Sequence, residues 1–418
     1  MTGRKFYGQP SDVVGSKEYA LVIPNMKKTL TVYVFLSIAP CVIFLILHVL
    51  YRPSVRLTVL YAAVSILGAL LIFFGTYGKI TLFTLYVILI GQPFIAHFFV
   101  VDFHTLRPNF SAVKTNDVGL LRGLDRQITV TTDSNGFRTS TADAYNKKFK
   151  IFLVGGSTVE QIDLDDRKTT SASLERGIGN SDYSVINTGV SGLRTVNHVA
   201  TINAIKRFEP YLIIIQLGVN DWGCALKDTC KRSPLDPRNW PISLAAFSMT
   251  NMLRSWGTWW SNAIDFRAVM GHYEEKRKTV LSDSRLSEYL RLFHYDFAEL
   301  LRTCETIAAT CVITTQPTSY KSENFEDPKF LQSLWMTPPL EDWALTENSL
   351  IKISTAYNNH IRNNTSCANC LLFDLDLLMR GKRSFFFDDV HFTNEGAKFF
   401  AEELLGFMRT HGLVKVLQ

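Results

Sequence analysis

The sequence predicts an α/β domain built on a parallel β-sheet and preceded by three membrane-spanning helices. Two patterns along the 418 residues indicate this arrangement. From Phe149 onward, short apolar runs rich in β-branched residues alternate with stretches of helical periodicity, which is typical of βα units around a parallel sheet. Before that point, between Leu30 and Val101, three apolar runs follow one another without a Lys, Arg, Asp or Glu inside any of them.

The apolar runs cover about 30–50, 57–74 and 80–101. Each is close to the roughly 20 residues that a helix needs to cross the hydrocarbon core of a bilayer. Because a charged side chain is costly at that depth, the three uncharged runs predict transmembrane helices within 29–101, after a cytoplasmic segment 1–28. More basic residues flank the N-terminal side of the spans than the other side, so the positive-inside rule places the C-terminal domain outside the cytoplasm.

Cysteine spacing favours the same compartment. Cys224 with Cys230, and Cys367 with Cys370, are close pairs in segments expected to be loops, and local disulfides there would suit an oxidising environment. The spacing of the second pair also occurs in redox and zinc motifs, but no second pair or nearby histidine accompanies it. Cys304 continues an apolar helical face, which predicts a buried free thiol.

The segment 102–148 is predicted to connect the membrane region to a globular domain at 149–418, with a tight turn at Asn135-Gly136. Five parallel strands are expected in that domain, and they are Phe149 to Val154, Ser184 to Asn187, Tyr211 to Leu217, Cys311 to Gln316 and Leu371 to Leu375. A helix capped by Thr195 is expected between the second and third strands, and a last helix capped by Thr393.

Two long excursions, at about 222–284 and 318–348, interrupt this pattern. Both leave the C-terminal ends of predicted strands, and that edge of an open α/β sheet is where ligands bind. Their tryptophans would suit contact with sugar faces, contact with a membrane interface, or packing against the sheet. Trp222 and Trp240 are the candidate substrate-binding residues among them.

A candidate nucleophile follows the first predicted strand. In Gly155-Gly156-Ser157 the two glycines allow a sharp turn, and a helix that starts there would favour negative charge near the serine oxygen. Gly189, after the second strand, could present a main-chain N–H to a reacting carbonyl oxygen, as could the side chain of Asn220 after the third. Together with the N–H of Ser157, these groups are the expected oxyanion hole.

A candidate general base precedes the last helix. His391 could accept the serine proton, and Asp388, three residues earlier, could fix the tautomer of the imidazole. As a metal site the segment has too few ligands, so no metal is expected. Four elements that each supply one part of an acyl-transfer site therefore occur at strand ends or before the final helix.

These residues resemble the SGNH (GDSL-like) hydrolases. Ser157, Gly189, Asn220 and His391 stand in the order and contexts of the four residues that name the family, over about 149–405. The resemblance implies a three-layer α/β/α sandwich with a five-stranded parallel sheet of the flavodoxin-like kind. One departure is Gly156, which stands where the family usually has an aspartate. Members with a membrane anchor and similar motifs are often bacterial cell-envelope proteins, which implies a glycan ester as substrate.

The leading functional hypothesis is an esterase that removes O-acyl groups, in particular acetyl, from an envelope glycan through an acyl-enzyme on Ser157. The same acyl-enzyme resolved by a sugar hydroxyl would make an O-acyltransferase supplied by a membrane acyl-donor partner. A catalytically silent membrane-tethered scaffold is the third hypothesis. The chemistry needs no cofactor, and the net charge of +6 is spread without a basic stripe, so nucleic acid is not an expected partner. The expected location is a bacterial inner membrane with a periplasmic catalytic domain.

Overall fold

The computed structural model describes residues 103–226 apart from 120, 140 and 142, together with 273–337 and 342–414. The predicted transmembrane segment 29–101, Trp240 and Cys230 lie outside the described residues. Within these described ranges, no helix is both long enough and apolar enough to cross a membrane.

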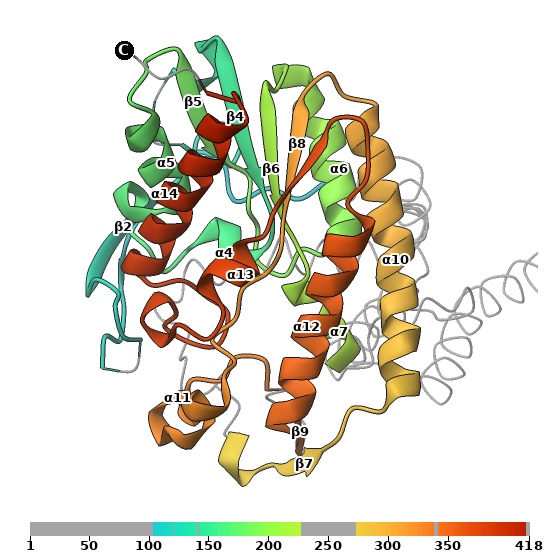
Figure 1. The fold of residues 1–418 in the computed structure, drawn as a ribbon. Coiled ribbons are helices and arrows are strands. Elements are labelled where there is room, and N and C mark those ends of the chain that lie inside the picture. Colours follow the sequence, from blue (N-terminus) through green and yellow to red (C-terminus); the bar gives the residue numbers. More distant parts are fainter. Residues whose placement is uncertain are drawn as a thin grey trace, which may run out of the picture. The chain divides into compact units, whose positions relative to one another are not determined.

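A six-stranded, mostly parallel sheet forms the centre of the described domain (Figure 1). The strand order is β10-β8-β6-β4-β5-β3, and every neighbouring pair is parallel except β3 with β5. The five predicted strands all form, with ends within about two residues of those expected, as β4 Phe149–Val154, β5 Tyr183–Asn187, β6 Leu212–Gln216, β8 Thr310–Thr314 and β10 Cys370–Phe373.

The sixth strand, β3 (Arg138–Thr139), was not predicted, and it makes the sheet mixed where five parallel strands were expected. It is two residues long and lies in the polar connecting segment, so it has no apolar run that would reveal it. The same segment contains an antiparallel hairpin of β1 (Ser111–Thr115) and β2 (Gln127–Thr131). The predicted turn also forms, with Gly136 at φ +77°.

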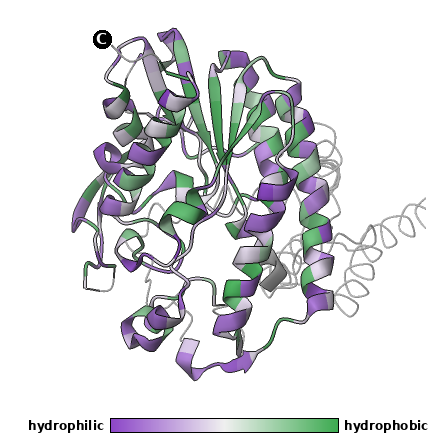
Figure 2. Ribbon diagram, viewed as in Figure 1, coloured by the Kyte–Doolittle hydropathy of each residue, from purple (hydrophilic) through white to green (hydrophobic). Residues whose placement is uncertain are grey.

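Helices cover both faces of the sheet because successive strand side chains point to opposite sides. On β4, Ile151 and Leu153 join a core with α5 (Thr170–Ile178) and α14 (Asn394–Thr410), whereas Phe152 and Val154 face the other layer. That second layer comprises α6 (Thr195–Ile205), α10 (Asp283–Glu305) and α12 (Glu347–Asn364). The apolar strands lie between helices whose outer surfaces are more hydrophilic (Figure 2).

Shorter elements complete the described chain. They are α4 Ser157–Glu160, α7 Val219–Leu226, α11 Pro328–Gln332, α13 Leu375–Met379, and the 3₁₀ turns η1 Ala144–Asn146, η2 Asp166–Lys168, η3 Lys206–Phe208, η5 Tyr273–Glu275, η6 Ser322–Glu326 and η7 Arg383–Phe385. The two excursions meet outside the main sheet, where β7 (Arg277–Thr279) from the first pairs in parallel with β9 (Trp343–Leu345) from the second.

The two predicted helix caps have different outcomes. Thr393 caps α14 as expected, because its side chain accepts a hydrogen bond from the N–H of Gly396. Thr195 is instead the first residue inside α6, and its hydroxyl donates to Asp221 at 2.8 Å. The carboxylate of Asp221 also accepts from the N–H of Thr195 at 3.3 Å. The buried Asp221, in the first turn of α7, therefore accepts from the first N–H of α6, and the Thr195 hydroxyl acts as a donor to it and not as the cap.

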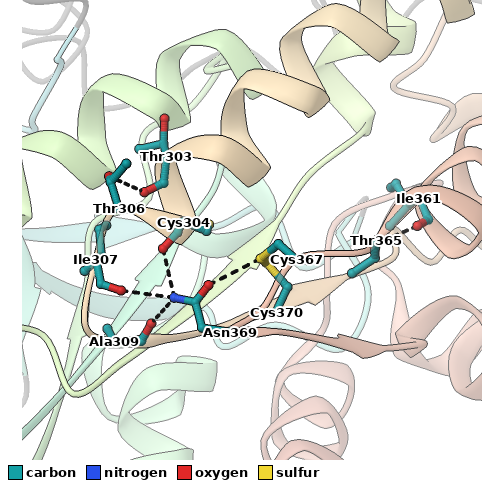
Figure 3. The surroundings of a disulfide bond; sticks show 10 residues. All are labelled: Thr303, Cys304, Thr306, Ile307, Ala309, Ile361, Thr365, Cys367, Asn369 and Cys370. Carbon is teal, nitrogen blue, oxygen red and sulfur yellow. Dashed lines mark hydrogen bonds between the residues drawn. A yellow bond between two sulfur atoms is a disulfide. The ribbon is translucent and has the colours of Figure 1, made fainter.

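Cys367 and Cys370 form the predicted local disulfide, with their Cα atoms 5.0 Å apart (Figure 3). Between them, the side-chain amide of Asn369 donates to three main-chain oxygens, those of Cys304 at 2.8 Å, Ile307 at 3.1 Å and Ala309 at 2.7 Å. The Asn369 amide therefore joins the start of β10 to the turn between α10 and β8, and the disulfide closes the short loop that carries this amide. Cys304 is a buried free thiol, as predicted.

Candidate active site

The candidate site lies at the carboxyl ends of the parallel strands. The chain order of the five parallel strands across the sheet is 2-1-3-4-5, so the direction of the order reverses at β4. Crevices for ligands occur at such a switch point, outside the carboxyl ends of the strands. Ser157 follows β4 and Asn220 follows β6, so the two residues lie on either side of this point.

Ser157 is the first residue of α4, and the turn that places it there requires both glycines. A Cβ atom on Gly155 would come within 2.4 Å of the Val159 side chain and 2.9 Å of the Gln216 carbonyl oxygen. A Cβ atom on Gly156 would come within 2.4 Å of Nδ2 of Asn220. A side chain at position 156 would therefore displace the Asn220 amide from its present position.

Ser157, His391 and Asp388 form one hydrogen-bonded chain. Nε2 of His391 lies 2.8 Å from Oγ of Ser157, and Nδ1 lies 2.6 Å from Oδ2 of Asp388. A carboxylate can only accept, so Nδ1–H donates to Asp388 and Nε2 accepts from the serine hydroxyl. Asp388 has no exposed surface, and its Oδ1 accepts from the N–H groups of Val390 and His391 at 2.8 and 2.7 Å.

The negative charge of Asp388 favours the protonated form of the His391 imidazole. Burial of His391 opposes protonation, but the negative charge and hydrogen bond of Asp388, with smaller effects from Asp163 and Asp389, outweigh it. The pKa of His391 is therefore raised above its usual 6.5. An imidazole with this environment can take a proton from a hydroxyl and hold it as a stabilised cation.

Asn220 lies beside the turn that precedes Ser157. One hydrogen of its side-chain amide is donated to the carbonyl oxygen of Leu193 at 2.7 Å. The same nitrogen lies 2.4 Å from the position that a Cβ of Gly156 would take, so the amide is next to the start of α4. This position is compatible with donation to an oxygen bound at Ser157 by the second hydrogen of the amide.

Gly189 does not have the predicted role. Its N–H is already donated to Oδ1 of Asn187 at 2.8 Å. A Cβ atom there would lie 2.3 Å from the main-chain nitrogen of Glu160 and 2.7 Å from the carbonyl carbon of Val159. The structure contradicts an oxyanion role for Gly189 and shows instead that the glycine allows its loop to pack directly on the backbone of α4.

Gly192 is the glycine in this loop that faces open space. It has φ +84°, and no atom lies within 4 Å of the position that a Cβ would take. It directly precedes Leu193, whose carbonyl oxygen holds Asn220. The sequence contains both glycines in Gly189-Val190-Ser191-Gly192, and nothing in that pattern distinguishes the packed glycine from the exposed one.

Two buried charges fix the loop and helix around the nucleophile. Oε2 of Glu160, at the end of α4, accepts from both the N–H and the hydroxyl of Ser191, and burial raises the pKa of Glu160. The Arg138 guanidinium donates to the main-chain oxygens of Glu160 and Gln161, each at 2.7 Å, and to Asp166. Neither role was predicted, since the partners lie more than 20 residues away in the sequence from Arg138 and about 30 from Glu160.

The tryptophan predictions need correction. Trp222 has no exposed surface and packs edge-on against Tyr357 in the core, so its indole cannot contact a substrate at the surface. Trp240 lies outside the described residues. Among the described residues, Trp335 from the second excursion has an indole near the candidate site, with its ring centroid 5.6 Å from that of His391 in a T-shaped arrangement.

Asp389 holds the segment that carries Trp335. This fully buried carboxylate accepts from the N–H of Trp335 at 2.6 Å, the N–H of Met336 at 3.1 Å and the hydroxyl of Tyr320 at 2.7 Å. Burial and the neighbouring Asp388 raise the pKa of Asp389 to about 6. Within the described ranges, no group of three or more His, Cys, Asp or Glu side chains could hold a metal ion.

Comparison with known proteins finds similarity in structure only. No family model matches the sequence, and no curated protein matches it. Among solved structures, a member of the lipolytic protein G-D-S-L family from Veillonella parvula is 10% identical with a TM-score of 0.34, covering 62% of this chain and 98% of its own. The esterase EstA from a Pseudoalteromonas species is 12% identical with a TM-score of 0.35, covering 63% and 97%.

The C-terminal catalytic domain of peptidoglycan O-acetyltransferase A from Streptococcus pneumoniae is also similar. It is 11% identical with a TM-score of 0.31, and the match covers 65% of this chain and 98% of that domain. These similar structures are therefore described as esterase, lipolytic and acetyltransferase proteins. At such identities and TM-scores, the activity of this chain has to be inferred from its own side chains.

Proposed function

We propose that this protein is a serine esterase that acts through an acyl-enzyme on Ser157. His391 is the general base, and Asp388 orients its imidazole and stabilises the imidazolium. The observation that carries this proposal is the hydrogen-bonded chain of hydroxyl, imidazole and carboxylate, with distances of 2.8 and 2.6 Å. The same arrangement of roles occurs on several unrelated folds that perform acyl transfer.

The reaction proceeds in two balanced halves. Oγ of Ser157 bonds to the ester carbonyl carbon while its proton passes to Nε2 of His391, and the carbonyl oxygen becomes an oxyanion. The bond from carbon to the alcohol oxygen then breaks, and the alcohol leaves with the proton from Nε2. Water attacks the acyl-enzyme in the same way, which releases the carboxylic acid and restores the serine.

Three N–H donors are proposed for the oxyanion. They are the main-chain N–H of Ser157, the side chain of Asn220, and the main-chain N–H of Gly192 in place of that of Gly189. Supporting this choice, Gly192 faces open space beside the carbonyl that holds Asn220, whereas the N–H of Gly189 already has an acceptor. Loss of one such donor typically costs about two to three powers of ten in rate.

An O-acyltransferase is the second candidate. It would use the same acyl-enzyme, with a sugar hydroxyl in place of water as the acceptor and a membrane partner as the source of the acyl group. The partly buried Trp335 favours this candidate, because an indole beside His391 could hold a sugar ring where the acceptor oxygen must reach the imidazole.

The proposed substrate is an O-acylated, in particular O-acetylated, cell-envelope glycan outside the cytoplasm. The charge-free apolar runs within 29–101 support a membrane anchor, and the disulfide between Cys367 and Cys370 supports an oxidising compartment. A reporter that is active only outside the cytoplasm, fused after Gln418, should be active. Strong activity of a cytoplasmic reporter at the same position would contradict this location.

The activity is tested with the full chain, purified in a mild detergent, and a small acetyl ester. Ser157→Ala should lower hydrolysis by about four powers of ten or more, because the nucleophile is removed. Ser173→Ala in α5, where the hydroxyl accepts a hydrogen bond from Arg176 of the same helix, should leave the rate unchanged. Full activity of Ser157→Ala would overturn the proposal and leave the scaffold hypothesis. Acetylated glycan formed when a glycan acceptor is added would favour the transferase.

A further inference from the structure

Two aromatic rings contact the imidazole of His391, and they differ in exposure. Phe387 stacks on it with ring centroids 5.6 Å apart and an interplanar angle of 10°, and Phe387 is 3% exposed. The Trp335 indole meets the imidazole at the same centroid distance but at 81°, and Trp335 is only partly buried. Phe387 therefore supports the imidazole from the core, whereas Trp335 lies beside it with part of its surface open to solvent.

The position of Trp335 is fixed by the loop that carries the candidate triad. Asp389 directly follows Asp388 in the sequence, and its carboxylate accepts from the main-chain N–H groups of Trp335 and Met336. Tyr320, from the beginning of the same excursion, donates its hydroxyl to Asp389 as well. Two of these contacts involve the main chain, so they hold the backbone that carries the indole relative to the loop that carries the imidazole.

The proposed reaction determines which part of the substrate lies beside His391. In acylation, the proton on Nε2 of His391 must reach the oxygen of the departing alcohol, and in deacylation the attacking hydroxyl must lie at the same place. The alcohol part of an ester, or an acceptor hydroxyl, is therefore the part of the substrate next to His391. The acyl group, by contrast, is attached to Ser157.

We propose that Trp335, positioned by Asp389, is a binding wall for the alcohol part of the substrate, and that it selects a sugar ring there by contact with the indole. This inference rests on the proposed function, since it assigns a substrate side to the same site. It predicts selectivity for the alcohol and not for the acyl group. Asp389 is a positioning residue, because it acts through Trp335.

The experiment compares two acetyl esters that give the same acetyl-enzyme, ethyl acetate and an O-acetylated methyl glucoside, on the full chain. Trp335→Ala should lower kcat/KM for the sugar ester by about tenfold, since stacking contributes on the order of one power of ten. For ethyl acetate, kcat/KM should fall by a clearly smaller factor, because ethanol is too small to contact the indole. Trp335→Phe should retain most of the selectivity.

A matched control comes from the same excursion. Trp343 is also partly buried, but it lies in β9, where its neighbours include the Arg285 guanidinium. Trp343→Ala should leave the ratio of kcat/KM for the sugar ester to kcat/KM for ethyl acetate as in the parent. In the Trp335→Ala background, Asp389→Asn should cause no further change in that ratio, whereas Asp389→Asn alone should lower it. An additive effect of the two substitutions would contradict the positioning role.

An equal loss on both esters in Trp335→Ala, including complete loss, would overturn the inference, because it would indicate a general structural role. A circular dichroism spectrum and a thermal midpoint like those of the parent show that the variant is folded. Ser157→Ala distinguishes this failure from failure of the proposed function. If Ser157→Ala is inactive but the ratio of kcat/KM for the two esters does not depend on Trp335, the esterase proposal is retained. The proposal that Trp335 binds the alcohol part is then rejected.

Discussion

At the scale of single residues, the most informative feature is the environment of His391. Its imidazole bridges a hydroxyl and a buried carboxylate, and Asp388 raises its pKa in spite of burial. A general base must be neutral before it accepts a proton, so protonation at low pH removes activity. The raised pKa therefore moves the acid limb of the activity profile upward.

We predict that kcat/KM for a small acetyl ester rises with pH through an apparent pKa above 6.5. Asp388→Asn should move this pKa downward, because the attraction of the carboxylate for the imidazolium is lost. It should also lower kcat by about four powers of ten, because the wrong tautomer is favoured. The measurement is a pH profile of kcat/KM for both proteins.

The control for this profile is Asp283→Asn, which removes an exposed carboxylate paired with Lys352 at the start of α10. Its acid limb should match that of the parent. If Asp388→Asn kept the parental apparent pKa, another group would have to control the limb.

Residues also show where prediction from sequence ends. Ser157, Asp388 and His391 could be identified because each stands at a strand end or before a helix within a short motif. Gly189 was assigned from its place after the second predicted strand and from the family resemblance, and Trp222 from its place at the start of an excursion, but in each case burial determines the role. The structure shows that Gly189 packs on backbone and that Trp222 packs in the core, while Gly192 is exposed and Trp335 is partly buried.

At the scale of elements, the placement of α4 depends on close packing by the loop after β5. Gly189 touches the backbone of Val159 and Glu160, and Asn187 donates to the carbonyl oxygen of Val159 at 2.6 Å. Arg138 holds the other end of the same short helix. Four residues of helix cannot be stable alone, so these contacts determine where its first residue, Ser157, lies.

We predict that Gly189→Ala lowers the free energy of unfolding by about 1–3 kcal/mol, because the new methyl group would meet main-chain atoms that cannot move independently. The displacement of α4 should also lower kcat. Gly406→Ala is the matched control, since Gly406 is an exposed position inside α14 with no atom within 4 Å of the added Cβ.

Gly406→Ala should stabilise the protein by about 0.5–1 kcal/mol through helix propensity and leave kcat unchanged. Urea unfolding of both variants measures the difference. A Gly189→Ala protein with the stability and kcat of the parent would show that the loop packing is not what positions α4.

The elements that sequence could predict are those with long apolar patterns. The five parallel strands form as expected, and β5 and β6 are buried at every residue, as their mostly apolar runs predict. The long α10 has its buried side chains on one face. β3 was missed because Arg138 and Thr139 carry no apolar signal, and their strand pairing depends on contact with β5. The start of α6 was misassigned because the Thr195 hydroxyl donates to Asp221, which comes from the first turn of α7 and is 26 residues away in the sequence.

At the scale of the described domain, the candidate site and the disulfide lie at opposite ends of the parallel strands. The candidate site lies at the carboxyl ends of the strands, whereas Cys370, the first residue of β10, and its disulfide partner lie where that strand begins. The disulfide therefore supports the edge of the sheet without touching the site. Its loss should affect stability far more than catalysis.

We predict that the double variant Cys367→Ser and Cys370→Ser is less stable than the parent by about 2 kcal/mol, the loop-closure entropy of a short cross-linked segment. Its kcat should equal that of the parent at a temperature where both proteins are folded. A reductant should lower the thermal midpoint of the parent and leave that of the double variant unchanged. A large loss of kcat in the folded double variant would contradict this separation.

The parallel pairing of β7 with β9 has a consequence for protein engineering. Arg277 pairs with Trp343 and Thr279 with Leu345, so the two excursions share one hydrogen-bonded ladder even though a long helix and a core strand separate them in the chain. A recombinant hybrid that exchanged only the second excursion, which carries Trp335, would replace one strand of that ladder without its partner. Transplanting specificity between related scaffolds should therefore succeed when both excursions are exchanged as one cassette.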